Sequence, residues 1–176
     1  MFVVSLFNET SRVFVFSLFV ILVFGASSGC GRHPGGGAHE YKDYTTKLGL
    51  ARPADLERVV FRMLDKHQYQ IVRRTSSQEK IYYETEWRQR YPFEDEIKVG
   101  VASARSRIII TGRPRDFGGT GTYIVYRVRF IAENEVRFSD TSGYTRIPIS
   151  ERAKRYFRRI ANDIKTELNI EYHKGR

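Results

Sequence analysis

The residues in this sequence best suited to acid–base chemistry are Glu84 and Glu86. They lie two positions apart in residues 80–87, where polar and apolar side chains alternate as they do in a strand. Two carboxylates on one strand face can serve as general acid and general base. Such a pair more often lies opposite basic side chains of a neighbouring strand, and the chain has 30 Lys and Arg residues. We therefore predict a structural carboxylate pair and no enzymatic activity.

Two further segments could bind a small ligand but lack the setting that such binding requires. The glycine-rich residues 118–122 would cradle a phosphate only if a helix began directly after them, whereas residues 123–126 favour a strand. His33 and His39 are separated by glycines, which makes a poor metal site. We predict a hairpin loop at the glycines, and we predict no metal and no cofactor.

The single cysteine, Cys30, follows a segment that is typical of an export signal. Residues 13–24 carry no charge, but at 1.5 Å per residue they reach only about 18 Å, short of the roughly 30 Å hydrocarbon core. Ser28, Gly29 and Cys30 resemble the lipobox of bacterial lipoproteins, although Ser27 replaces the usual aliphatic residue. The resemblance implies cleavage before Cys30 and a diacylglycerol on its sulfur. The alternatives are ordinary cleavage after Ser28 and an uncleaved anchor, and all three place the following domain outside the cytoplasm.

The chain carries a net charge of +10, which indicates anionic partners without indicating a fold. Because export separates the domain from cytoplasmic nucleic acid, we expect anionic lipid, anionic glycan or an acidic protein surface, and no nucleic acid. Aromatic residues make up 14% of the sequence, which is too many for a disordered chain, and one cysteine cannot form an intrachain disulfide. The composition thus favours one globular domain behind a targeting segment.

The sequence divides into an export signal at residues 1–29, a lipid-anchored flexible tether at 30–47 and a domain at 48–176. The tether is glycine-rich and shows no apolar periodicity. In the domain, apolar residues at helical spacing predict one helix that begins near Pro53 and another that begins at Ser150.

Between these helices, alternating patterns predict strands at residues 69–75, 80–87, 107–111, 122–131 and 135–139. A turn at Glu133 and Asn134 is predicted between the last two strands. The order of elements predicts an α+β fold, in which an antiparallel sheet of four to five strands carries the N-terminal and C-terminal helices on one face. The other face of the sheet is expected to stay partly open.

The alternation in residues 122–131 predicts which side chains lie on the open face. If Tyr126, Val128 and Phe130 face the helices, the intervening residues point the other way. Interleaved aromatic and Arg side chains suit recognition of proteins or anionic glycans, although the same pattern could simply cover a half-buried sheet face. The candidate binding surface on this face consists of Tyr82, Tyr123, Arg127, Arg129 and Arg137.

A second basic cluster lies on the C-terminal helix, opposite its apolar stripe, and consists of Arg152, Arg155, Arg158 and Arg159. Near an anionic membrane, each of these charges would add up to about 1 kcal/mol of binding free energy. The alternative is that the cluster is only a solvated helix face.

The pattern also makes a prediction for the one tryptophan. Trp87 alternates with Ile81 and Tyr83, so we expect it to be buried against the helices. Trp87→Ala would then lower the free energy of unfolding by about 3–5 kcal/mol.

A longer match links the chain to a known family. Residues 69–71, 80–83 and 84–87, which follow the predicted first helix, resemble the BamC-like (NlpB-type) lipoproteins. The resemblance covers about residues 50–170, and it implies a helix-grip domain in a non-catalytic, lipid-anchored component of outer-membrane biogenesis. The enterobacterial protein has two such domains, whereas one is predicted here, so its specific partner does not carry over. Gly31, which follows Cys30, is compatible with export to the outer membrane.

We therefore expect an envelope protein anchored to the outer membrane by a lipid, with its domain in the periplasm, that acts as a scaffold or adaptor for another envelope protein. The alternative is a ligand-binding module that uses the Tyr- and Arg-rich sheet face for anionic glycan or lipid headgroups. The two differ in salt dependence, because binding to headgroups or glycans weakens steeply with ionic strength.

Overall fold

The structure is a computed structural model, and it describes residues 43–115 and 124–174. Helices and strands follow one another along the chain in the order β1 (Tyr44–Ala51), α2 (Pro53–Lys66), β2 (Ile71–Ser76), β3 (Ile81–Thr85), β4 (Arg88–Arg90), α3 (Glu94–Ile97), β5 (Val101–Pro114), β6 (Tyr126–Phe138), β7 (Thr145–Arg146) and α4 (Glu151–Lys174). None of the helices in these residues is long and apolar enough to span a membrane.

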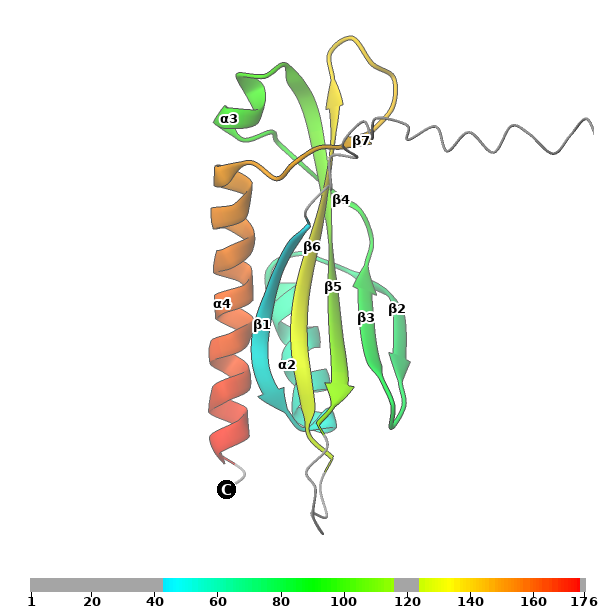
Figure 1. Cartoon of the computed structure of the whole chain (residues 1–176), viewed down its shortest axis with the longest axis vertical. Helices are drawn as coiled ribbons and strands as arrows, with labels where there is room; N and C mark the ends of the chain where they lie inside the picture. Colours follow the sequence, from blue (N-terminus) through cyan, green and yellow to red (C-terminus); the bar gives the residue numbers. More distant parts are fainter. Residues whose placement is uncertain (1–42, 116–123, 175–176) are drawn as a thin grey trace, which may run out of the picture. The chain divides into compact units, whose positions relative to one another are not determined.

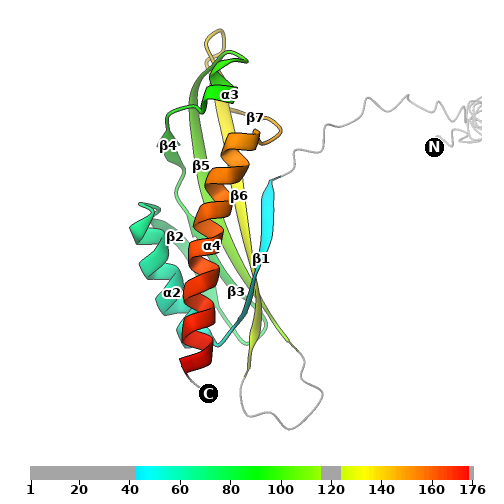
Figure 2. The ribbon, with the colours of Figure 1, turned by 90° about the vertical axis from the view of Figure 1, so that its left-hand side faces the viewer.

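The strands form one antiparallel sheet in the order β1-β6-β5-β3-β2, with β4 paired to β5 and β7 paired to β6. Figures 1 and 2 show α2 and α4 on the same side of this sheet. The predicted α+β class, with both helices on one face, is confirmed. The expected number of four to five strands is wrong, because the described residues form seven. The additional strands are β1 and the short β4 and β7.

Strand β1 corrects the boundary between tether and domain. Tyr44 to Lys47 were expected in the tether, but they begin β1 and pair with β6. The Tyr44 ring packs against Phe130 and Phe157 at centroid distances of 6.1 and 6.4 Å, and Leu48 is fully buried. A bulge follows Lys47, and the next paired residue is Gly49, whose φ of 121° is accessible to glycine at little cost.

The two long helices follow their predicted patterns. Helix α2 has a proline in its first turn, and Leu56, Val60 and Leu64 are buried on its apolar side. The Ser150 hydroxyl accepts a hydrogen bond of 3.2 Å from the amide of Ala153, as expected of an N-cap. The buried residues of α4 are Ala153, Phe157, Ile160, Ala161, Ile164 and Leu168. These two apolar stripes and the inner face of the sheet form the main core.

The turn expected at Glu133 and Asn134 is absent, because β6 runs continuously through both residues. Both side chains are buried, and each has polar partners. Glu133 accepts hydrogen bonds from Arg107 and another arginine, and Asn134 accepts one of 2.8 Å from Arg90. Two adjacent polar residues, which in the sequence predict a turn, can thus lie inside a strand when residues distant in sequence form hydrogen bonds with their side chains.

Candidate functional site

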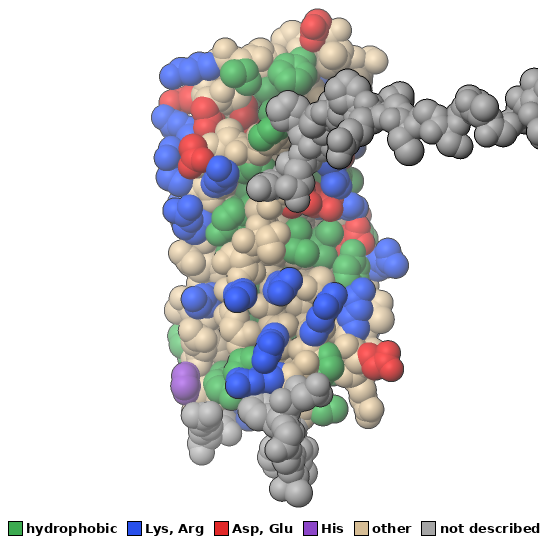
Figure 3. All heavy atoms as spheres, viewed as in Figure 1, with side chains coloured by type: hydrophobic (Ala, Val, Ile, Leu, Met, Phe, Trp, Pro, Cys, Tyr) green, Lys and Arg blue, Asp and Glu red, His purple; other side chains and the backbone are tan. Residues whose placement is uncertain are grey.

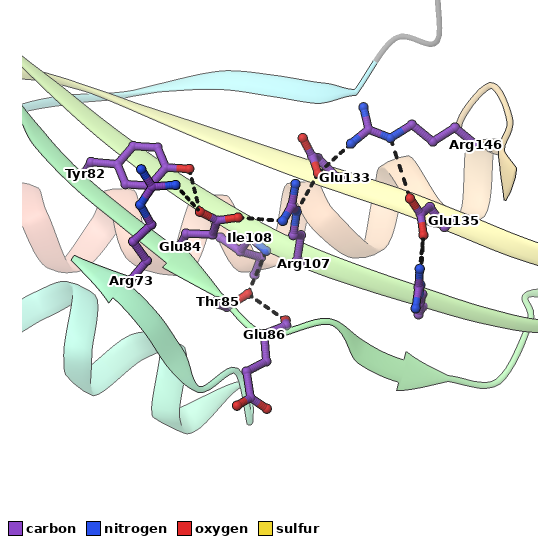
Figure 4. Close-up of polar contacts among 11 residues, drawn as sticks. Arg73, Tyr82, Glu84, Thr85, Glu86, Arg107, Ile108, Glu133, Glu135 and Arg146 are labelled. Atoms are coloured by element: carbon purple, nitrogen blue, oxygen red, sulfur yellow. Dashed lines mark hydrogen bonds and ion pairs between the residues drawn. The ribbon is translucent and has the colours of Figure 1, made fainter. Parts of the chain in front are cut away.

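The middle of the open sheet face carries an ion-pair network centred on Glu84 (Figure 4). Glu84 accepts hydrogen bonds of 2.5 Å from Arg107 and 2.8 Å from the Tyr82 hydroxyl, and Arg73 lies 3.7 Å away. Glu86 is exposed, and its carboxylate points away from that of Glu84 in Figure 4. The two carboxylates therefore do not converge, and Glu84 has the basic cross-strand neighbours expected of a structural residue.

The network continues along β6 through two more carboxylates. Glu133 accepts hydrogen bonds of 2.6 Å from Arg107 and 2.8 Å from Arg146. Glu135 accepts one of 2.6 Å from Arg105 and lies 3.8 Å from Arg146. We call this set the central network; its three carboxylates and four arginines are Glu84, Glu133, Glu135, Arg73, Arg105, Arg107 and Arg146. Its charges nearly cancel.

The pKa values of Arg107 and Tyr82 are both shifted in the direction that favours their hydrogen bonds in the central network. Burial works against the charged form of Arg107, but its hydrogen bond to Glu133 and the neighbouring carboxylates raise its pKa above the ordinary value. Burial raises the pKa of Tyr82, and so does the hydrogen bond that its hydroxyl donates to Glu84. Arg107 therefore stays charged and Tyr82 stays protonated at neutral pH.

The position of Trp87 corrects a prediction. Strand β3 ends at Thr85, whose hydroxyl accepts a hydrogen bond from the Ile108 amide and donates one to the carbonyl of Glu86. The alternation stops there, and the half-buried Trp87 ring contacts Arg105 and Arg107 at 4.9 and 4.8 Å from the ring centroid. Trp87 therefore packs on the central network instead of beneath the helices, and the large stability cost expected for a core tryptophan does not apply.

The end of the sheet beyond the central network is basic and unbalanced. Lys47 lies directly opposite Arg129, and Arg127 lies directly opposite Arg113. Lys80, which precedes β3, extends the second of these rows, because its neighbour Ile81 pairs with Gly112. We call these five exposed side chains the basic patch. Figure 3 shows Lys and Arg gathered across this half of the face.

The basic patch differs from the central network in having no counter-charge among the described side chains. Within residues 43–115 and 124–174, none of its five side chains forms an ion pair with a carboxylate, whereas each arginine of the central network does. Like charges directly opposite each other in a sheet are destabilising, by about 0.2–1 kcal/mol per pair if the magnitude matches that of favourable pairs. The patch contains two such pairs, Lys47 with Arg129 and Arg113 with Arg127.

A hollow of about 540 Å³ lies within the basic patch. The described residues that line it include no carboxylate; they are Thr45, Lys80, Thr111, Arg113, Pro114, Arg127, Arg129 and Ile131. This lining combines cations and hydroxyl donors with an apolar side chain, a set that suits an anion with a carbon body. In the part of the chain that the structure describes, no group of His, Cys, Asp and Glu side chains is arranged to hold a metal ion.

The sequence-predicted binding residues do not all come together. Arg127 and Arg129 belong to the basic patch, and Tyr82 adjoins it, since the ammonium of Lys80 lies 4.8 Å from the centroid of the Tyr82 ring. Arg137 lies toward the other end of β6, where it donates a hydrogen bond of 3.2 Å to Ser103. Tyr123, like the lipidation candidate Cys30, lies outside the described residues.

The arginines of α4 lie on the helical side of the sheet and do not join the basic patch. Arg152 pairs with Glu94 at 2.5 Å, and its amide donates a hydrogen bond of 2.9 Å to Asp95. Arg155 and Arg159 are exposed and form no ion pair with the described residues. The helix cluster and the sheet cluster are therefore two separate surfaces.

Lys47, Lys80 and Arg113 are the members of the basic patch that were not identified as candidates. Lys47 was placed in the tether, although Tyr44, Thr46 and Leu48 alternate with it as in a strand. Lys80 begins the strand pattern that contains Tyr82, and Arg113 leads into the glycine-rich segment. Their side chains meet only through the cross-strand register, which the sequence does not specify.

No protein-family model matches the chain, and none of the curated proteins matches it. One solved structure similar to the chain is that of the uncharacterized conserved protein YugN from Geobacillus kaustophilus HTA426, with a TM-score of 0.36 and 13% sequence identity. The similarity covers 74% of this chain and 90% of that chain. A likeness this distant says nothing about function, which must follow from the geometry of the site.

Proposed function

We propose that this chain is a non-catalytic binding protein of the cell envelope, and that its basic patch holds an anionic ligand. The observation that carries the proposal is the contrast along one sheet face. The central network nearly neutralises its own charges, while the adjoining patch leaves five cations without carboxylate partners among the described residues. Two directly opposed like-charge pairs reduce stability in the absence of a ligand, and an anion would remove that penalty.

The proposed setting of this activity rests on the N-terminal segment. We propose that Cys30 carries the lipid, and that the domain lies in the periplasm on a tether anchored to the outer membrane. An adaptor role in outer-membrane biogenesis is what the resemblance to BamC-like lipoproteins implies, and it is compatible with an anionic ligand on the open face. The ligand classes that fit this setting are lipid headgroups and anionic glycans.

Charge reversal on the patch tests the proposal. The full-length protein in detergent should bind heparin, and Arg127→Glu/Arg129→Glu should weaken binding at least about tenfold, which corresponds to roughly 1.4 kcal/mol. Because the interaction is between exposed charges, binding should also weaken steeply as ionic strength rises. Isothermal titration calorimetry at several salt concentrations measures both effects.

The matched control reverses two exposed arginines of α4 instead. Arg155→Glu/Arg159→Glu changes the net charge by the same amount but leaves the sheet face intact. It should weaken binding much less than the patch variant does. An equal loss in both variants would mean that total charge governs binding, and a loss confined to the α4 variant would assign the site to the helix cluster; either result contradicts the proposal.

A further inference from the structure

We infer that the ligand of the basic patch is a compact molecule that carries two phosphoryl groups. This inference rests on the proposed anion-binding function and narrows its ligand class. Three features of the patch lead to it: the charge that must be matched in the available volume, the spacing of the cations, and the kinds of donor present.

The first feature is charge density. The hollow of about 540 Å³ has the size of a small-molecule site, and five cations surround or adjoin it. A carboxylate or a sulfate ester supplies one negative charge. A glycan of uronic acids or sulfated sugars would therefore need several sugar units to match the charge of the five cations. A phosphate monoester supplies about 1.5–2 negative charges. Two phosphoryl groups therefore deliver roughly 3–4 charges on a body small enough for the hollow.

The second feature is that the cations fall into two rows across the sheet. Lys47 and Arg129 face each other in one row. Arg127 and Arg113 face each other in the next, which Lys80 extends. Facing residues lie about 5 Å apart between Cβ atoms, and rows two residues apart along a strand are separated by roughly 7 Å. Each row can thus clamp one phosphoryl group, with the two groups held a short carbon body apart.

The third feature is the chemistry of the donors. Arg113, Arg127 and Arg129 present planar guanidinium groups, which bind phosphate oxygens through paired hydrogen bonds. Thr111 lies opposite Arg129 in the first row, and Thr45 lies opposite Ile131 one step beyond that row. Both threonines add hydroxyl donors to the lining, and Ile131 adds an apolar side chain. Among the described residues, no carboxylate lines the hollow, so none of these side chains repels a dianion.

The test compares ligands that differ by one phosphoryl group. Full-length protein in detergent is titrated by calorimetry with a hexose bisphosphate, a hexose monophosphate, inorganic phosphate and heparin. We expect the bisphosphate to bind at least about tenfold more tightly than the monophosphate, because it engages both rows. Arg129→Ala and Arg113→Ala, which each weaken one row, should bring the bisphosphate close to the affinity of the monophosphate. Arg158→Ala, on the exposed side of α4, should preserve the difference.

Lipid nanodiscs distinguish a lipid-borne ligand from a free one. Discs that contain phosphatidylinositol bisphosphate are compared with discs brought to the same total charge with phosphatidylserine. Preference for the bisphosphate discs supports a bisphosphorylated lipid headgroup. Binding of the hexose bisphosphate without such a preference supports a free bisphosphate.

The remaining outcomes separate this inference from the proposed function. If heparin binds and the bisphosphate binds no better than the monophosphate, the inference is wrong and the anion-binding function stands. If neither heparin nor any phosphate ligand binds, both are wrong.

Discussion

Glu96→Ala should lower the free energy of unfolding by about 3–5 kcal/mol, most of the stability of a small domain. The Glu96 side chain is 1% exposed and that of Arg90 is 9% exposed. Two hydrogen bonds of 2.6 and 2.7 Å join them, and Arg90 donates another of 2.8 Å to Asn134. Removing the carboxylate leaves a buried guanidinium without its counter-charge, which is the costly way to break such a pair. Urea denaturation followed by circular dichroism measures the change.

Two further variants separate the burial of the charge from its presence. Glu94 belongs to the same short helix α3 and pairs with Arg152, but its side chain is 67% exposed. Glu94→Ala should therefore cost less than about 1 kcal/mol. The double variant Arg90→Met/Glu96→Met removes both charges at similar volume and should recover much of the stability lost in Glu96→Ala. A cost for Glu96→Ala as small as that for Glu94→Ala would contradict this account of the pair.

Cys30→Ser should release the protein from the membrane completely or leave its precursor unprocessed. A protein anchored by several acyl chains stays bound, whereas a protein without them keeps only its weak surface charge interactions. Membrane fractionation and the intact mass of the mature protein measure the effect. Gly31→Ala, which preserves the thiol, is the matched control and should stay in the membrane fraction. A mature wild-type chain whose Cys30 carries a free thiol would contradict lipidation.

The helices and the core could be predicted because their patterns are local. Pro53 and Ser150 mark the starts of α2 and α4, and the apolar residues of each helix recur at helical spacing. The sequence does not indicate strand β1, because the glycines just before it are typical of a flexible tether. The predicted tether therefore ends at residue 47, beyond the start of β1 at Tyr44. The continuity of β6 was missed for a different reason. Glu133 and Asn134 are stabilised inside the strand by arginines distant in sequence, and no local pattern indicates them.

The candidate site was predicted in part. Alternation placed Arg127 and Arg129 on the face opposite Tyr126 and Val128, and the structure agrees. The grouping of these two with Lys47, Lys80 and Arg113 depends on the register of four strands, so it appears only in the fold. The reading of Trp87 failed because strand periodicity was extended two residues past the end of β3.

The central claim is that the basic patch is maintained for an anion at the expense of stability. Arg129→Thr removes one directly opposed like-charge pair and leaves a residue with good strand propensity. Thermal unfolding of this variant and of the wild type, at low ionic strength with and without inorganic pyrophosphate, tests the claim most directly. The account predicts that the variant melts at a higher temperature than the wild type without pyrophosphate, and that pyrophosphate raises the melting temperature of the wild type more than that of the variant. A variant that melts at a lower temperature and is stabilised by pyrophosphate as much as the wild type would contradict it.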